Sequence, residues 1–348
     1  MISIFRRNKS TVGLDIGSGF IKAAVVDHSG DEPVLTNAVY MPLVADAIVE
    51  GEIMDPGAVA DTVRSLMDDL GVNGSNVVTA VGGRDVIVKK IQMDRMPADD
   101  AREVIRWEAE QYVPFDMENV QLDFQILDPD DVGLQMDVLL VAAKRELVDQ
   151  KIALMRDAGL EPTIVDVDAF ALNNAFEFNY PESTRGAVTL VNVGHEISNL
   201  ILLQDSVPVL TRDIPFGSRR LREDLRRTHG LSPDEADAVM RGRSERQDEF
   251  TELLEERASE LAMGIERAVA FLSVDGAANL GGPIFVCGGA AGIPRLADAI
   301  GARLHARTEI ANPLQRLRAA PDAIGLFPLE ELAPMLMLPI GLALRGAA

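Results

Sequence analysis

The sequence predicts an α/β protein that contains two related domains. Its 348 residues are enough to bury two hydrophobic cores, and 47% of them are apolar, as in globular proteins. An apolar strand, a polar turn and a second apolar strand occur twice, at residues 12–27 and 187–205. A glycine turn of another kind, at residues 283–294, follows a buried strand and leads into a helix. These three turns are also the first candidates for a ligand site.

Charge and composition exclude several classes of protein. The net charge of −22 disfavours nucleic acid and anionic lipid as primary partners, because binding them requires clustered lysine and arginine. The single cysteine, Cys287, excludes an internal disulfide and fits a reducing compartment. No apolar run has the roughly 20 residues of a transmembrane helix, and no signal peptide is visible. We expect the opening MISIFRRNKS to be a disordered tail, although weak contact of its basic residues with an anionic membrane stays open.

The first turn, in VGLDIGSGFIKAAVVD, has the composition of a phosphate loop in an unusual setting. Gly17 and Gly19 let backbone N–H groups approach anionic oxygens, and the Ser18 hydroxyl adds a donor. A Rossmann or Walker loop leads into a helix, whereas this turn leads into a strand that starts at Phe20. Taken alone, the turn has an ordinary hairpin as its simplest interpretation.

The second turn, in AVTLVNVGHEISNLILLQD, aligns with the first. Asn192 falls on Asp15, Gly194 falls on Gly17, and His195 follows that glycine. A further strand is predicted at residues 207–214, so each domain is expected to open with a β-meander.

The third turn, in PIFVCGGAAGIP, places Gly288 and Gly289 at the end of a buried strand. Its helix is predicted to start near Pro294, because proline suits the first helical position.

In this order and spacing, the three turns resemble the two phosphate loops and the adenosine motif of the actin-like ATPase superfamily. The resemblance implies an actin-like fold whose two domains surround a nucleotide cleft, with ATP and Mg²⁺ as cofactors. Lys22 would reach a terminal phosphate, Asp15 would hold Mg²⁺ through water, and Asp168 matches by position the residue that places the attacking water. The implied nucleotide-binding residues are Asp15, Gly17, Ser18, Gly19, Phe20, Lys22, Asn192, Gly194, His195, Gly288 and Gly289.

Residues 84–160 are predicted to form a strand-helix-strand-strand insert, with its first helix at residues 99–113 before Pro114. The insert resembles the extra subdomain of the cell-division protein FtsA and of the PilM family. The segments IRWEAEQYVPFD, DVDAFALNNAFE, TRDIPFGS and PIGLALRG are similar to PilM sequences, and the resemblance covers residues 11–346. The expected domains are residues 11–185 with the insert, residues 186–338 with a charged helical subdomain at about 217–281, and residues 339–348 returning to the first domain.

The resemblance implies a cytoplasmic ATP-binding scaffold of type IV pilus assembly, peripheral at the inner membrane through its protein partners. The expected partner is the N-terminal cytoplasmic peptide of the inner-membrane protein PilN. Other inner-membrane pilus proteins and the pilus motor ATPases are further expected partners. Two alternatives stay open: an FtsA-like cell-division protein and a small-molecule kinase on the same fold. No basic amphipathic helix follows Gly346 to support the first, and no sugar-binding polar cluster supports the second.

Two departures from the superfamily pattern bear on catalysis. Asn192 stands where an aspartate is usual, so a charge that helps to hold Mg²⁺ or orient water is absent. His195 and Glu196 stand where a second glycine is common, and His195 is interpreted as a hydrogen-bonding turn residue rather than a base. We therefore expect ATP hydrolysis to be slow or absent, and Asp168 has the alternative interpretation of an acidic residue at a helix N-terminus.

Trp107 is the only tryptophan of the chain. At about 100° per residue it lies off the apolar stripe of its predicted helix, which contains Ala101, Ile105 and Ala109. PilM proteins bind the PilN segment in a groove between the insert and the first domain, so the resemblance suggests Trp107 as a partner contact there. Packing of Trp107 on a neighbouring loop is the alternative.

Overall fold

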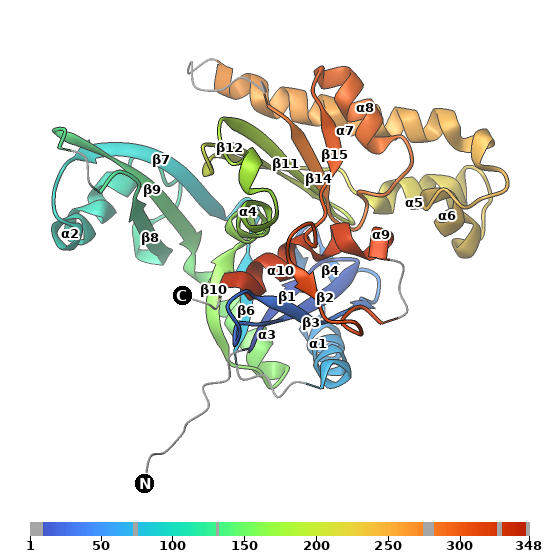
Figure 1. The fold of residues 1–348 in the computed structure, drawn as a ribbon, viewed down its shortest axis with the longest axis horizontal. Coiled ribbons are helices and arrows are strands. Elements are labelled where there is room, and N and C mark those ends of the chain that lie inside the picture. The colour runs from blue at the N-terminus through green and yellow to red at the C-terminus, as the bar shows by residue number, and fades with distance from the viewer. Residues whose placement is uncertain (1–9, 72–75, 130–131, 274–281, 326–328, 346–348) are drawn as a thin grey trace, which may run out of the picture.

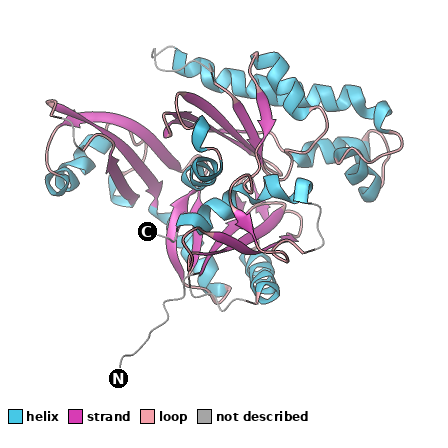
Figure 2. Ribbon diagram, in the orientation of Figure 1, coloured by secondary structure: helices cyan, strands magenta, loops and turns pink. Residues whose placement is uncertain are grey.

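The computed structural model describes residues 10–71, 76–129, 132–273, 282–325 and 329–345. These residues form two large mixed sheets, a smaller inserted sheet that projects from one side, and a helical layer along the opposite edge (Figure 1). Figure 2 shows helices between the two large sheets as well as along the outer faces of the molecule. Apart from Ser10, the expected N-terminal tail lies outside the described residues.

The first sheet is built from both ends of the chain, in the order β10-β6-β1-β2-β3-β16. Strands β1, β2 and β3 form the predicted antiparallel meander, and β6 runs parallel to β1. Helix α1 begins after Asp55, whose side chain caps the N–H of Ala58, and ends at Gly71 in the left-handed region. The strands are β1 (Ser10–Ile16), β2 (Phe20–Asp27), β3 (Val34–Pro42), β6 (Val77–Val81), β10 (Pro162–Val167) and β16 (Arg318–Ala319); the hairpin β4 (Ile48–Val49) and β5 (Glu52–Ile53) and helices α1 (Pro56–Leu70) and α3 (Arg145–Asp157) flank them.

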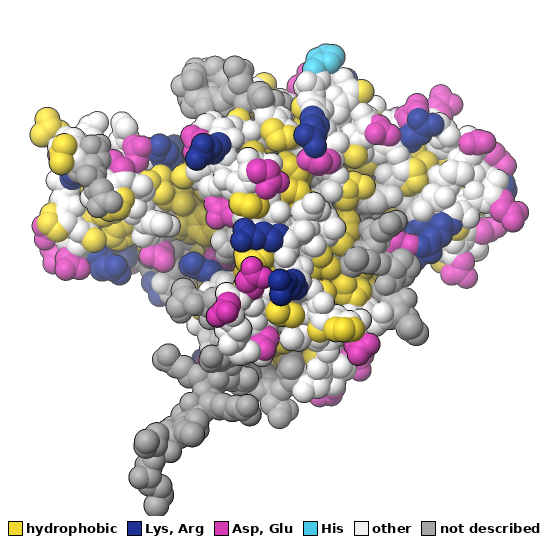
Figure 3. Space-filling view, in the orientation of Figure 1, with side chains coloured by type: hydrophobic (Ala, Val, Ile, Leu, Met, Phe, Trp, Pro, Cys, Tyr) yellow, Lys and Arg dark blue, Asp and Glu magenta, His cyan; other side chains and the backbone are white. Residues whose placement is uncertain are grey.

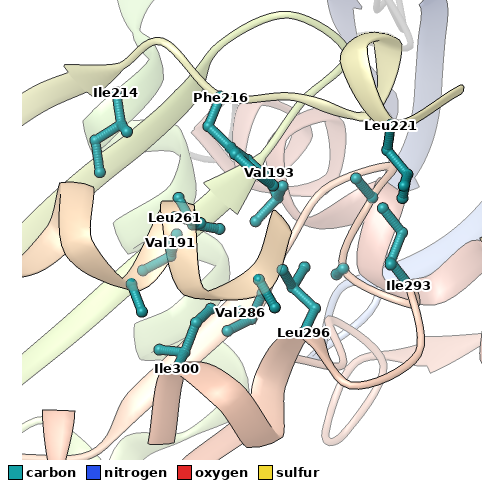
Figure 4. Packing of buried hydrophobic residues seen from close by; sticks show 14 of the residues in the cluster. Val191, Val193, Ile214, Phe216, Leu221, Leu261, Val286, Ile293, Leu296 and Ile300 are labelled. Carbon is teal, nitrogen blue, oxygen red and sulfur yellow. The ribbon is translucent and has the colours of Figure 1, made fainter. Parts of the chain in front are cut away.

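The second sheet repeats this arrangement, in the order β13-β12-β11-β14-β15. Its meander is covered by α7 and α8, whose Leu261, Leu296 and Ile300 interlock with Val191 and Val286 of the sheet (Figure 4). Ser232 and Glu235 form a capping box at the start of α6. The elements are β11 (Ala187–Val193), β12 (Ser198–Gln204), β13 (Val207–Ile214), β14 (Ile284–Cys287), β15 (Thr308–Ile310), α5 (Ser218–Arg227), α6 (Pro233–Met240), η3 (Gln247–Phe250), α7 (Thr251–Ser273) and α8 (Leu296–Leu304).

The insert has the predicted strand-helix-strand-strand order, with its sheet arranged β7-β9-β8. Helix α2 ends at Ala109, four residues before the predicted end at Val113. The N–H groups of Tyr112 and Val113 both bond to the Ala109 carbonyl, so the chain turns early. The turn brings the Val113 side chain into the core of the insert, and this packing outweighs the continuing helical pattern. The elements are β7 (Val86–Asp94), α2 (Ala98–Ala109), η1 (Met117–Asn119), β8 (Val120–Ile126) and β9 (Gln135–Lys144).

The chain returns to the first sheet earlier than the expected residue 339. Strand β16 pairs with β3 at Arg318 and Ala319, and Leu332 and Leu336 pack in the same cluster as Leu35 of β3. The predicted boundary missed this return because β16 is only two residues long and carries no apolar pattern. The other domain boundaries stay predictions. The closing elements are α9 (Leu329–Leu332), η4 (Ala333–Leu336) and α10 (Met337–Leu344), and α4 (Asp168–Asn179) and η2 (Pro181–Ser183) join the two sheets.

The backbone of helix α10 is in direct contact with the backbones of β1 and α4. A Cβ atom on Gly13 would overlap the carbonyl oxygen of Pro339, and one on Gly341 would overlap the carbonyl oxygen of Ala171. Buried side chains of both large sheets and of α10 belong to one cluster, which includes Val78, Leu190 and Leu342. The two sheets are therefore joined through a shared core.

We expect Gly13→Ala to destabilise the protein by about 2–3 kcal/mol, because the added methyl group must push α10 away from β1. Gly292→Ala is the matched control, since a Cβ atom there would meet nothing within 4 Å. Thermal unfolding followed by circular dichroism measures both. Equal midpoints for the two variants would show that α10 can move off β1 without loss.

Candidate functional site

The two hairpin turns meet at the junction of the two sheets. A Cβ atom on Gly19 would lie 2.7 Å from Cγ and 2.8 Å from Cβ of His195, so only glycine allows this approach. In the described part of the chain, the N–H groups of Ser18, Gly19, His195 and Glu196 donate to no protein acceptor. Free N–H groups on two facing turns can bind an anion, as the sequence predicted for a phosphate.

The first turn holds the predicted pair of charged side chains. Asp15 and Lys22 are directly opposite each other on β1 and β2, and their carboxylate and ammonium groups form an ion pair. The two side chains are only 12% and 14% exposed. Lys22 is therefore held beside Asp15 at the base of the turn, and a phosphate there would share it with that carboxylate.

The second turn holds a chain of amides instead. The Asn192 side chain donates to the Asn199 side chain at 3.1 Å, and the Asn199 side chain donates to the Asp213 carboxylate at 2.9 Å. These two hydrogen bonds connect β11, β12 and β13. The Asn192 side-chain oxygen faces Gly288, where a Cβ atom would lie 2.5 Å from it. The third turn is thereby brought against the second, as its sequence motif implied.

The third turn differs from the prediction in one respect. Helix α8 begins at Leu296, after Arg295 in the left-handed region at φ 71°, so Pro294 lies before the helix rather than at its first position. Gly288 itself has φ 94°, which only glycine adopts readily, and its N–H donates to the Pro334 carbonyl at 2.8 Å. Gly289 is exposed at the top of this turn.

Asp168 is the first residue of α4, and it faces the end of β6. A Cβ atom on Gly82 would overlap its carboxylate oxygen. Burial, together with the nearby negative charge of Asp15, raises the pKa of Asp168 to about 7, and the positive charge of Lys151 opposes this shift. A carboxyl group that changes its charge near neutral pH, close to two phosphate-loop candidates, is typical of a functional site.

Two charged residues near Asp168 were not identified by the sequence motifs. Lys151 of α3 lies close enough to Asp168 and Asp15 for their charges to offset part of the burial that lowers its pKa. Asp213, near the end of β13, lies 3.6 Å from the Cβ position of Gly83, and burial raises the pKa of its carboxyl group. No local pattern marks either residue, because both reach the site through the packing of distant elements.

His195 acts as the hydrogen-bonding turn residue that the sequence suggested. Its Nδ1 lies 3.2 Å from the Ser218 hydroxyl, and burial lowers its pKa. Within the described ranges, no three His, Cys, Asp or Glu side chains are grouped to hold a metal ion directly. The expected Mg²⁺ contact of Asp15 through water stays a prediction.

Trp107 lies on the insert, away from the charged residues around Asp168, and is 74% exposed. Its helix packs through Ala101 and Ile105 on the face of the inserted sheet that carries Ile91 and Leu140. The opposite face of that sheet packs against the core shared by the two large sheets. The structure therefore does not place Trp107 between the insert and the first domain, where the resemblance had suggested a partner contact.

Comparison with known proteins identifies the family. A family model described as "Type IV pilus assembly protein PilM" matches residues 13–347. The chain belongs to the PilM family. A chain of the solved structure of a PilM–PilN type IV pilus biogenesis complex is 28% identical to this family member and superposes with a TM-score of 0.83, covering 97% of this chain and 98% of that one.

More distant relatives share the fold, and the predicted actin-like class is confirmed. EutJ of Carboxydothermus hydrogenoformans is 16% identical with a TM-score of 0.56, over 96% of this chain and 89% of its own. MreB5 of Spiroplasma citri, solved with ADP, is 13% identical with a TM-score of 0.52, over 96% and 94%. FtsA of Bacillus subtilis is 22% identical over an alignment of 259 positions, which covers 67% of this chain and 57% of FtsA. This PilM family member thus spans little more than half the length of that relative.

None of the helices in the described ranges combines the length and the apolar character needed to cross a bilayer.

The raised pKa of Asp168 predicts a pH-dependent stability. Because the folded state holds this proton more tightly than the unfolded chain, the stabilisation is complete below about pH 4 and is lost as pH rises through about 7. We expect Asp168→Asn to gain about 1–2 kcal/mol over the wild type between pH 5 and pH 8. Thermal unfolding across that range measures the difference. Parallel profiles for the two proteins would show that Asp168 does not titrate there.

Proposed function

We propose that this PilM family member is a cytoplasmic scaffold of type IV pilus assembly that binds ATP with Mg²⁺ and the N-terminal cytoplasmic peptide of PilN. It would lie peripherally at the inner membrane through its protein partners. The observation that carries the proposal is the match to the PilM–PilN complex over 97% of the chain at 28% identity. Contacts with other inner-membrane pilus proteins and with motor ATPases stay predictions.

The hydrogen-bond donors of the two hairpin turns fit a nucleotide. Unpartnered N–H groups on two facing turns suit phosphate oxygens, and Lys22 adds a cation at the base of the first turn. Asp15 and Asp168 would repel a bare phosphate. Asp15 would hold Mg²⁺ through water, and the ion would supply the positive charge that offsets this repulsion. We expect slow turnover, because the Asn192 amide is engaged with Asn199 and contributes no charge.

ATP with Mg²⁺ is expected to bind the wild-type protein once any co-purified nucleotide is removed. Lys22→Ala should weaken binding by about 1.5–3 kcal/mol, because a charge-assisted contact is lost while Asp15 stays unpaired. Lys90→Ala is the control, since Lys90 pairs with Asp137 on the insert. Isothermal titration calorimetry measures the affinities. Absence of both heat and a thermal shift for the wild type would refute the nucleotide assignment.

The surface proposed for the peptide lies where the insert meets the body of the molecule. Val88 of β7 and Val141 of β9 are paired on the body-facing side of the inserted sheet and are only partly buried. Ile164 of β10 and Phe170 of α4 are partly buried in the same cluster. Figure 3 shows hydrophobic side chains gathered between the insert and the body. An extended peptide with a few apolar anchors suits such a surface.

A synthetic peptide of the PilN N-terminus should bind the wild type, and Val141→Asp should weaken it at least tenfold because a charge replaces an apolar contact. Trp107→Ala is the matched test of the other face of the insert and should change the affinity less than twofold. Fluorescence anisotropy of a labelled peptide gives both values. The reverse pattern, loss in Trp107→Ala alone, would place the peptide on α2.

A further inference from the structure

A short hairpin of the first domain reaches across to the second domain. Strands β4 and β5 are joined by Glu50 and Gly51, which both have positive φ, at 50° and 88°. Glycine adopts this region freely, whereas glutamate is disfavoured there. The Glu50 N–H donates to the Glu196 carboxylate of the second turn at 2.8 Å. The unfavourable backbone at Glu50 thus accompanies a contact between domains.

Arg219, at the start of α5, completes this contact. Its guanidinium lies 2.8 Å from the carboxylate of Asp46, which is in the loop between β3 and β4. It lies 2.5 Å from Glu196 and 3.1 Å from Glu223. Asp46 also has positive φ, at 63°. One arginine therefore links a carboxylate of the first domain to two carboxylates of the second.

Both ends of this network are attached to the phosphate-loop candidates. The loop between β3 and β4, which contains Asp46, begins at Leu43, whose N–H donates to the Gly19 carbonyl at 3.1 Å. On the other side, the N–H groups of Ser218 and Arg219 donate to the Gly194 and His195 carbonyls at 3.1 and 2.8 Å. Opening the two turns relative to each other would therefore separate Arg219 from Asp46.

A second ion pair lies on the same side of the molecule. Glu331 of α9, in the segment that packs on the first sheet, pairs with Arg243 in the loop after α6. In the view of Figure 1, α9 lies on the same side of the molecule as α5 and α6. Two separate contacts thus connect the helical region of the second domain to the first.

We propose that Arg219, Asp46, Glu50 and Glu196 form a latch that holds the two hairpin turns together and must open for a ligand to enter or leave between them. The proposal rests on the proposed nucleotide site for the identity of the ligand. Asp46 is 64% exposed and Arg219 is 35% exposed, so solvent and salt weaken their pairing. Such a contact can hold the closed form without preventing opening, whereas a fully buried pair would resist separation.

The first experiment tests the latch without any nucleotide. We expect Arg219→Gln to speed hydrogen exchange at the Glu50 amide at least fivefold, because Glu196 loses the cation that positions it. Arg220→Gln is the matched control, since Arg220 lies on the same helix and pairs with Glu260 within the second domain. Asp46→Asn, at an exposed position, gives a second variant that should fold normally and exchange faster. Unchanged exchange in both latch variants would overturn the proposal.

The second experiment measures release of a fluorescent ATP analogue by stopped flow. Arg219→Gln should release it three- to tenfold faster than the wild type, and Arg219→Gln combined with Arg243→Gln should be faster still. Arg220→Gln should match the wild type, and added salt should speed release of the wild type more than that of Arg219→Gln. If the wild type binds no analogue, the nucleotide assignment fails while hydrogen exchange still decides the latch. If all variants bind the analogue and release it at equal rates, the proposal that the latch must open for ligand release is wrong.

Discussion

The close approach of α10 to β1 and α4 is the contact on which the arrangement of the two domains depends. Gly13 and Gly341 remove the side chains that would otherwise separate these backbones. The chain returns to the first domain after passing through the second, so α10 joins both sheets in one buried cluster. With the domains joined at this point, the hairpin turns that end β1 and β11 are held facing each other, and the contact between Gly19 and His195 follows.

Features of the site that depend on local chain geometry could be predicted from the sequence. The strand–turn–strand pattern around Gly17 and Gly19 identified the first hairpin, because the spacing of glycines and apolar residues is a local signal. The early end of α2 and the two-residue strand β16 could not be predicted in this way. Val113 leaves the helix to fill a core that forms only when the inserted sheet is present. Strand β16 pairs with a strand far away in sequence and has no pattern of its own.

The charged residues of the site also divide into those that a local motif identifies and those that only the folded structure brings together. Asp15 and Lys22 are seven residues apart and become neighbours through one hairpin, so a motif could identify them. Lys151 comes from α3, which follows the insert and packs on the first sheet, and Asp213 comes from the second domain, so only the folded chain brings them near Asp168. Trp107 illustrates the converse error. Its exposure was predictable from the helical period, but the face of the insert that meets the first domain depends on how the inserted sheet is attached.

That attachment has a mechanical consequence. The inserted sheet leaves the body at Gly82 and Gly83, where added Cβ atoms would meet the carboxylates of Asp168 and Asp213. The Lys144 N–H donates to the Asp85 carbonyl at 3.0 Å across the base of the insert. Strand β9 runs ten residues outward from this base, which is about 33 Å of extended chain. A tilt of about 5° at the glycines would carry the far end, where Leu134 is 90% exposed, through about 3 Å for a rigid strand of that length. A small tilt beside the buried carboxyl groups of Asp168 and Asp213 would therefore become a much larger displacement at the tip of the insert.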